Sequence, residues 1–111
     1  MTKDTIAELI AELIAFRNER DWAQFHNPKD LALALSIEAG ELNECFLWKA
    51  AHEAKPEKVQ EELADVLSFA LLLAHHYGFD PAAIIRQKMA QNAAKYPVEK
   101  AKGTAKKYDE L

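Results

Sequence analysis

Residues 56–78, PEKVQEELADVLSFALLLAHHYG, decide the fold of this chain. Proline fits the first turn of a helix and glycine often follows the last, so Pro56 marks a start and Gly78 a stop. Between them, apolar residues recur every three or four positions, and they surround nearly the whole helix. They are Val59, Leu63, Val66, Phe69, Leu72 and Leu73. We predict a helix from Pro56 to His76 that is buried against other helices, including those of a second chain.

Similar signals predict three further helices. The segment Thr5–Glu8 reads as a capping box, in which side chains satisfy the first free amides of a helix. The pairs Asn27-Pro28 and Asp80-Pro81 each combine a capping residue with proline at the first helical position. The predicted spans are residue 6 to 20 or 22, 28 to 48, and 81 to 96. Because no segment alternates with the period of a strand, we predict an all-α fold, an antiparallel bundle of four main helices that oligomerisation completes.

The length of 111 residues predicts a single domain, which we assign to residues 1–96. Residues 97–111 are rich in lysine, and we predict a mobile C-terminal tail. Two interpretations of this tail remain open. It is either a frayed chain end or a flap that brings lysines to an anionic ligand.

Composition and charge exclude several classes of protein. The net charge of −4 argues against non-specific nucleic-acid binding, because such binding needs a basic face. The longest apolar run, Phe69–Ala74, is far too short to cross a membrane, and no signal peptide is recognisable. Cys45 is the single cysteine, and its place in an apolar stripe predicts a buried, inert thiol. We expect a cytoplasmic protein without nucleic-acid or membrane partners.

Four carboxylates interrupt the apolar stripes of the second and third predicted helices. Glu38 and Glu41 share one helix face, because residues three apart are neighbours, and Glu62 and Asp65 repeat this spacing. A charged surface would place lysine or arginine four residues after each acid. Those positions instead hold Leu42, Cys45, Val66 and Phe69.

Partly buried carboxylates without counterions repel one another unless a cation binds them. Ligands that are all oxygen suit Mg²⁺, with Mn²⁺ as a substitute. A di-iron bundle needs Glu-x-x-His, and no histidine here stands three residues after a glutamate. Gly40 lies between the two glutamates, where glycine costs about 1 kcal/mol relative to alanine, and this suggests close approach of a ligand or backbone. Patterning alone leaves two interpretations, a magnesium site and a solvated acidic face.

Several short motifs follow one another along nearly the whole chain. They are Arg20-Asp21-Trp22-x-x-Phe25-His26, Leu35-x-x-Glu38-x-Gly40-Glu41-Leu42, Trp48-Lys49, Glu61-Glu62-Leu63-x-Asp65-Val66-Leu67, Lys88-Met89-x-x-Asn92, Lys95-Tyr96-Pro97 and Lys107-Tyr108-x-Glu110-Leu111. In this order they resemble the motifs of the MazG-like all-α nucleoside triphosphate pyrophosphohydrolases, and most of all those of the dCTP pyrophosphatase branch.

The resemblance implies an enzyme that cleaves the α–β phosphoanhydride of a dNTP to a nucleoside monophosphate and pyrophosphate. It implies that the catalytic and Mg²⁺-binding residues are Glu38, Glu41, Glu62 and Asp65. The favoured substrate is dCTP, while dATP, dUTP and modified nucleotides stay open. The number of metal ions and the acid that activates water are also open.

The resemblance further implies a nucleotide site. Trp22, His26 and Trp48 would contact the base. The phosphates or the sugar would be contacted by Lys88, Asn92, Lys95 and Tyr96. Without the resemblance, the aromatic residues would be interpreted as part of the core. Lys88, Asn92 and Lys95 would be interpreted as an ordinary solvated helix face, and Tyr96 as a packed side chain. The linker at about Ala50–Lys55 is shorter than in some dCTP pyrophosphatases, which predicts an altered pocket wall.

Members of this family form dimers and tetramers, so the resemblance implies a homo-oligomer, with a tetramer as first choice and a dimer as second. Active sites would then combine residues of more than one chain. The alternative is a non-catalytic helical module that binds a partner or senses a nucleotide. That alternative explains the apolar stripes but not the acids without nearby bases.

Overall fold

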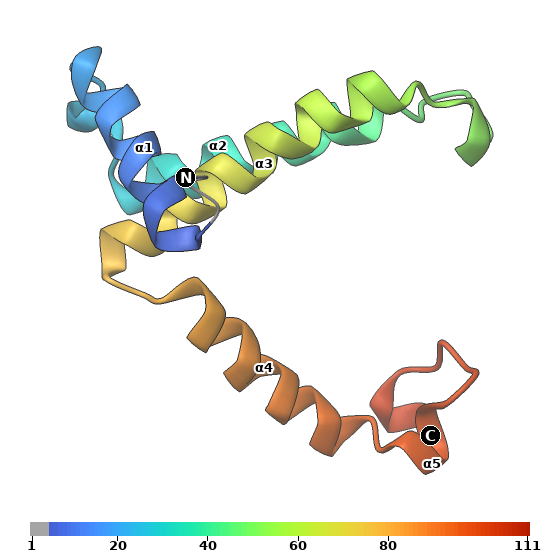
Figure 1. Cartoon of the computed structure of the whole chain (residues 1–111). Helices are drawn as coiled ribbons and strands as arrows, with labels where there is room; N and C mark the ends of the chain where they lie inside the picture. Colours follow the sequence, from blue (N-terminus) through green and yellow to red (C-terminus); the bar gives the residue numbers. More distant parts are fainter. Residues whose placement is uncertain (1–4) are drawn as a thin grey trace. The chain divides into compact units, whose positions relative to one another are not determined.

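The structure, a computed structural model, describes residues 5–111, which contain helices and turns but no strand. The first four residues of the predicted domain lie outside this part. The helices are α1 (Ile6–Glu19), α2 (Pro28–Glu44), α3 (Pro56–Tyr77), α4 (Pro81–Lys95) and α5 (Val98–Ala101), with short 3₁₀ helices η1 (Ala23–Phe25), η2 (Ala51–Glu53) and η3 (Tyr108–Glu110). The predicted all-α class is confirmed (Figure 1). Over the described residues, none of the helices combines the length and apolarity that crossing a bilayer requires.

The predicted helix starts are confirmed by their caps. The side chains of Thr5, Asn27 and Asp80 each accept a hydrogen bond from a backbone amide in the first turn, at 2.9–3.1 Å. Such caps satisfy amides that the helix itself leaves without partners. Gly78 follows α3 in the left-handed conformation, with φ of 71°, which costs glycine nothing. The starts of α1, α2 and α4 and the end of α3 therefore follow from local sequence.

The end of α2 differs from the prediction. The helix stops at Glu44 rather than at Trp48. Beyond it, the amides of Phe46 and Leu47 bond carbonyls three residues back, at 3.0 and 3.2 Å, so the helix tightens into turns. Trp48 then adopts a φ of 62°, which breaks the helical path.

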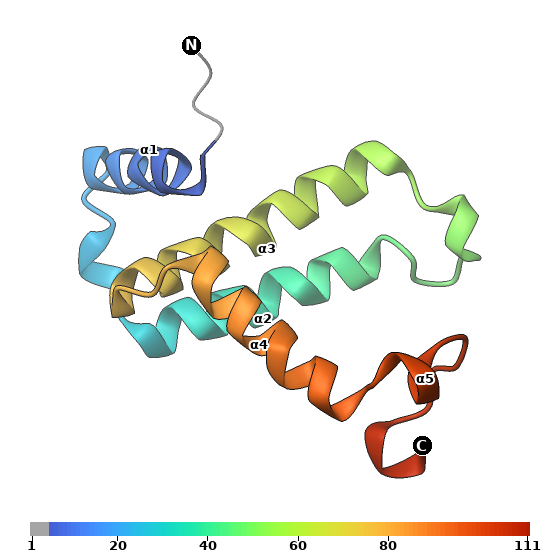
Figure 2. The ribbon, with the colours of Figure 1, turned by 60° about the horizontal axis from the view of Figure 1, so that its bottom comes forward.

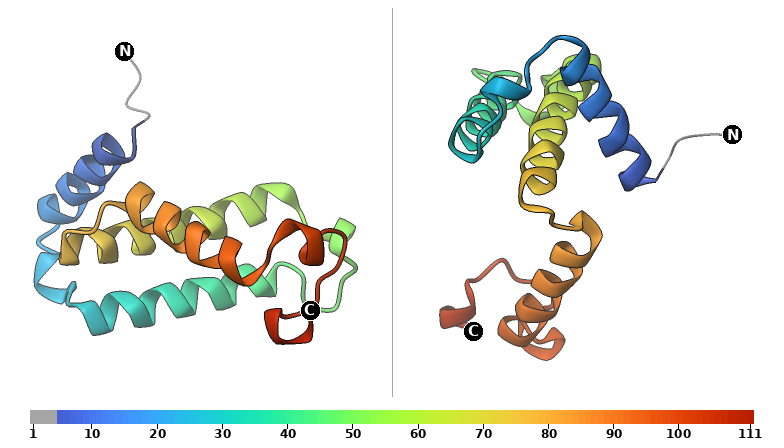
Figure 3. Two further views of the ribbon diagram at one scale, coloured as in Figure 1. Left: turned by 90° about the horizontal axis from the view of Figure 1, so that it is seen from below. Right: turned by 90° about the vertical axis from the view of Figure 1, so that its left-hand side faces the viewer.

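The chain forms two compact units, which divide after Gly78. In the first unit, α2 and α3 run side by side in opposite directions, as Figure 2 and the left view of Figure 3 show, and α1 packs against α3. The buried residues of this unit are Leu31, Cys45, Leu72 and Ala74, of which Leu31 is fully buried. The buried thiol predicted for Cys45 is confirmed. This core is small, and it leaves large apolar side chains exposed on both helices of the hairpin.

The second unit contains α4, α5 and η3. The ring of Tyr108 lies edge-on to Tyr96, with ring centroids 6.2 Å apart. The Nζ atom of Lys95 lies 5.0 Å from the centre of the same ring. The segment 97–111 therefore has local structure of its own, and its mobility stays a prediction.

Candidate metal centre and substrate pocket

The hairpin of α2 and α3 brings three of the four predicted acids together. Glu38 and Glu41 lie one turn apart on α2, and Glu62 lies on α3. Each offers a carboxylate oxygen, and these oxygens all lie within 4.8 Å of one another. The spacing of three residues sets the two α2 acids on one face, and the antiparallel pairing of the helices sets the third opposite them.

The close packing of this acid cluster, which consists of Glu38, Glu41 and Glu62, raises the pKa values of Glu41 and Glu62. The pKa of Glu41 is raised, first by a hydrogen bond with Glu38 and then by the charge of Glu38. Desolvation and the neighbouring Glu41 raise the pKa of Glu62, while Lys58 partly offsets this. One oxygen each of Glu38 and Glu62 is buried without a hydrogen-bond partner. Buried charges without partners are costly, so these two oxygens favour the binding of a cation in addition to Lys58.

The donor set fits a divalent metal. All three ligands are carboxylates, and oxygen ligands suit Mg²⁺ and Mn²⁺. The two buried oxygens without partners, Glu38 Oε2 and Glu62 Oε2, are free to bind an ion. A solvated acidic face does not describe Glu62, whose side chain is only 14% exposed.

Asp65, the fourth predicted acid, stands beside the cluster rather than in it. Its charge raises the pKa of Glu62, so the two groups are electrostatic neighbours. Asp65 also lines a separate pocket at the junction of α1, η1 and α3. It therefore lies between the acid cluster and this second site.

The second site, which we call the aromatic pocket, has a volume of about 310 Å³. Its lining residues are Leu13, Phe16, Arg17, Trp22, His26, Asp65, Ser68, Phe69 and Leu72. Trp22 and His26 thus share a pocket, as the sequence predicted. The Nδ1 atom of His26 is buried without a partner. Burial, and secondly the charge of Arg17, lower the pKa of this imidazole, so it is neutral at pH 7.

Sequence reasoning did not include most of the pocket wall among the site residues. Phe69 follows Asp65 by four residues, so helical spacing places both on one face and could have revealed it. Its ring lies 6.4 Å from that of His26, edge to face. Phe16 and Arg17 come from α1, and they reach the pocket only because α1 packs against α3. No local pattern signals that contact.

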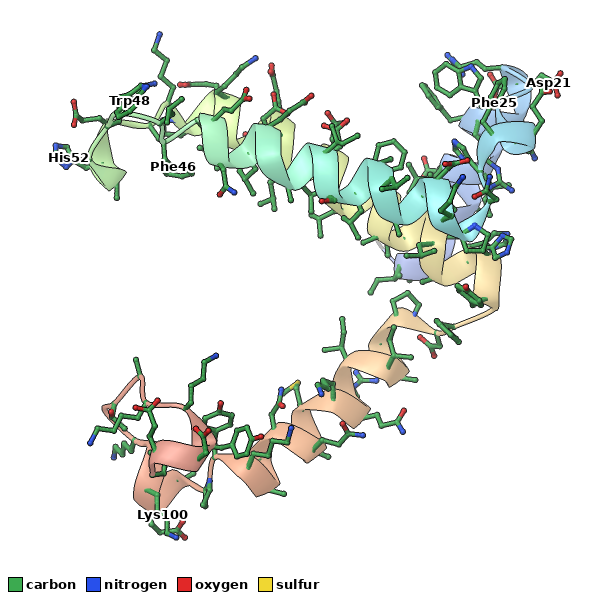
Figure 4. All side chains as sticks on the ribbon, turned by 180° about the vertical axis from the view of Figure 1, so that it is seen from behind. Asp21, Phe25, Phe46, Trp48, His52 and Lys100 are labelled. Carbon is green, nitrogen blue, oxygen red and sulfur yellow. The ribbon has the colours of Figure 1, made fainter. Side chains whose placement is uncertain are left out.

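Trp48 does not join Trp22 and His26 within one chain. Figure 4 shows Trp48 at one end of the hairpin, while Asp21, which precedes η1, and Phe25, the last residue of η1, lie at the opposite end. The side chain of Trp48 is 93% exposed and does not line the aromatic pocket. Its predicted contact with the base therefore requires a second chain.

The other predicted nucleotide contacts lie in the second unit. Lys88, Asn92 and Lys95 are exposed on α4, and Tyr96 follows the helix directly. Their spacing of four and three residues places the first three on one helix face. Contact of this face with a nucleotide stays a prediction.

Gly40 lies in α2 between the two glutamates, and a side chain added there would meet nothing within 4 Å. The close approach predicted for this glycine is therefore not made by the described part of the chain. The space beside Gly40 is open to a ligand or to another chain.

Comparison with known proteins places this site in a family. Residues 33–111, which hold the acid cluster and Asp65, match the model of the MazG-like family. The chain belongs to the MazG-like family. This MazG-like chain is 42% identical to dCTP pyrophosphatase 1 of Rattus norvegicus, over 99% of the chain and 68% of the relative. It is 41% identical to dCTP pyrophosphatase 1 of Homo sapiens, over the same shares.

A solved structure agrees with this assignment. The MazG-like chain superposes on a pyrophosphatase from Archaeoglobus fulgidus with a TM-score of 0.78 and 37% identity. The match covers 83% of this chain and 92% of the other. The resemblance drawn from the sequence motifs is thereby confirmed.

Proposed function

We propose that this protein is a Mg²⁺-dependent pyrophosphohydrolase that converts dCTP to dCMP and pyrophosphate, and that it trims the cytoplasmic nucleotide pool. One observation carries the proposal. Asp65 borders the aromatic pocket and is also an electrostatic neighbour of Glu62. A site for a base and a site for a phosphate-bound cation therefore adjoin, which is the arrangement a nucleoside triphosphate needs.

Each part of the site has a chemical task. Glu38, Glu41 and Glu62 would hold Mg²⁺, with Asp65 at their edge. When bound, such an ion would neutralise negative charge on the phosphates and would supply Lewis acidity at this site. Trp22 offers a flat face to the base, and stacking of this kind contributes about 1–3 kcal/mol. The neutral imidazole of His26 has one donor and one acceptor nitrogen with which to contact the base edge.

The relatives support the choice of substrate. Two of them carry the name dCTP pyrophosphatase and match almost the whole chain at 41–42% identity. The aromatic pocket, at about 310 Å³, is at the lower end of the range typical for small-molecule sites. Such a volume accommodates a single nucleobase.

The proposal includes a homo-oligomer, most simply a tetramer built from two dimers. Leu33 and Ile37 form one exposed apolar face of α2, and Leu63 and Leu67 form another on α3, all more than 40% exposed. Exposed apolar faces of this kind mark interaction surfaces. A second chain would cover them, and its Trp48 would complete the base site.

Thermal melting distinguishes this function from a module without catalysis. We expect Mg²⁺ together with a non-hydrolysable dCTP analogue to raise the melting temperature by several degrees, because both bind the folded state alone. The same protein must hydrolyse dCTP. Absence of any shift would favour a partner-binding module, and a shift without turnover would favour a nucleotide sensor.

A further inference from the structure

Two lysines share a pocket with the acid cluster. This pocket of about 420 Å³ lies on the side of the cluster away from Asp65, and its lining residues are Glu41, Glu44, Cys45, Lys49, Lys58 and Glu62. Lysine is a common partner of phosphate groups. The pocket therefore offers both the acids that would hold a metal and ammonium groups that would meet the phosphates on it.

Lys58 contacts the cluster directly. It stands one turn before Glu62 on α3, and its Nζ atom lies 3.9 Å from Glu62 Oε1 and 3.6 Å from Glu61 Oε2. Both distances exceed that of a good hydrogen bond. The Lys58 side chain is 61% exposed, and a lysine that precedes its acid by four residues is in the weaker orientation for a helical ion pair. Lys58 is thus a loosely held counterion.

A divalent cation bound to Glu62 would change the electrostatic potential at the Lys58 ammonium group. Without metal, the ammonium group offsets part of the repulsion among the acids. With metal bound, the same group faces a nearby double positive charge, while the phosphates of a nucleotide attract it. We propose that Lys58 moves from Glu62 to the substrate phosphates when metal and nucleotide bind. This inference rests on the proposed function.

The exchange has two consequences of opposite sign. Lys58 weakens metal binding to the nucleotide-free protein, because the ion must displace it. It strengthens nucleotide binding to the metal-loaded protein, because it then pairs with phosphate. Metal and nucleotide are therefore coupled, and the protein favours taking them up together. If Lys58 only stabilised the helix, replacing it would change neither the affinity for the metal nor the affinity for the nucleotide.

The test measures both affinities in Lys58→Met. Calorimetric titration of Mn²⁺ into nucleotide-free protein should show binding about 3- to 10-fold tighter than in the wild type, as expected when one screened charge near a dication is removed. At saturating Mg²⁺, a non-hydrolysable dCTP analogue should bind about 3- to 10-fold more weakly. Lys58→Arg keeps the charge and should restore both values toward the wild type.

Lys29 supplies a matched control. It is an exposed lysine on α2 that pairs with Asp30 at 3.6 Å, away from the acid cluster. Lys29→Met should leave the affinities for Mn²⁺ and for the analogue unchanged. If the wild type binds Mn²⁺ but Lys58→Met does not bind it more tightly, or binds the analogue equally well, the role of Lys58 is wrong. If the wild type binds no Mn²⁺, the proposed metal centre itself falls, and Lys58 with it.

Discussion

Replacing Glu41 by glutamine lowers kcat/KM for dCTP by at least about a hundredfold and leaves the protein folded, because the change removes a metal ligand without removing volume. Glu41 stands in the middle of the acid cluster, where it interacts with both Glu38 and Glu62. Steady-state kinetics and circular dichroism measure the two parts of this prediction.

The stability of metal-free Glu41→Gln is expected to change in the opposite direction to its activity. The pKa of Glu41 in the folded state is raised above its ordinary value of 4.5. The folded protein therefore loses stability as pH rises from 4.5 through the raised pKa, because Glu41 ionises more readily in the unfolded chain. Glutamine does not ionise. Without metal at pH 7, the variant should therefore melt no lower than the wild type, and added Mg²⁺ should raise its melting temperature less.

Glu44 is the matched control for this substitution. It lies one turn further along α2, and its charge also contributes to the raised pKa of Glu41, but it is outside the acid cluster. Glu44→Gln should keep kcat/KM within a few-fold of the wild type. Full activity in Glu41→Gln, or an equal loss in Glu44→Gln, would refute the assignment of the metal centre.

Replacing Trp22 by alanine raises KM for dCTP by about 5- to 150-fold with little change in kcat, which corresponds to the loss of one stacking contact. Trp22 lines the aromatic pocket, and Phe16 supports its ring edge to face at 6.0 Å. Trp22→Phe should keep much of the affinity. Phe25, which is 61% exposed in the neighbouring turn, provides the control, and Phe25→Ala should leave KM unchanged.

A related prediction concerns Trp48. Trp48→Ala should also raise KM, but because its contact comes from another chain, the two defects should complement each other. In a mixture of equal amounts of Trp22→Ala and Trp48→Ala with exchanging subunits, about half of the dimers are mixed, and each has one intact site. About a quarter of the wild-type sites should then be recovered. No recovery under full exchange would refute a contact between the base and Trp48 of another chain.

Local sequence was sufficient to predict where most helices begin and end. The caps at Thr5, Asn27 and Asp80, together with Gly78, are interactions within a few residues, and the structure forms them. In the capping box predicted at Thr5–Glu8, the Glu8 carboxylate accepts a hydrogen bond from the Thr5 hydroxyl. The early end of α2 was missed because apolar spacing continued to Trp48. The positive φ of 62° at Trp48 is not signalled by its residue type, because a bulky residue rarely adopts it.

The site was predicted in part. The acids of α2 and α3 were identifiable because they replace apolar residues without nearby bases, and three of them meet. The separation of Asp65 from those three, and the entry of Phe16 and Arg17 into the pocket wall, depend on how α1 packs against α3. Such contacts between distant segments leave no periodic trace in the sequence.

Identification of the products of dCTP hydrolysis shows which phosphoanhydride is cleaved and whether a metal ion is needed. Purified protein, dCTP and Mg²⁺ are incubated, and nucleotides and phosphates are separated by ion-exchange chromatography, with an EDTA-treated sample as control. We expect equal amounts of dCMP and pyrophosphate, and no turnover with EDTA. Formation of dCDP and orthophosphate, or undiminished turnover with EDTA, would contradict the proposed cleavage at a metal site built on Glu38, Glu41 and Glu62.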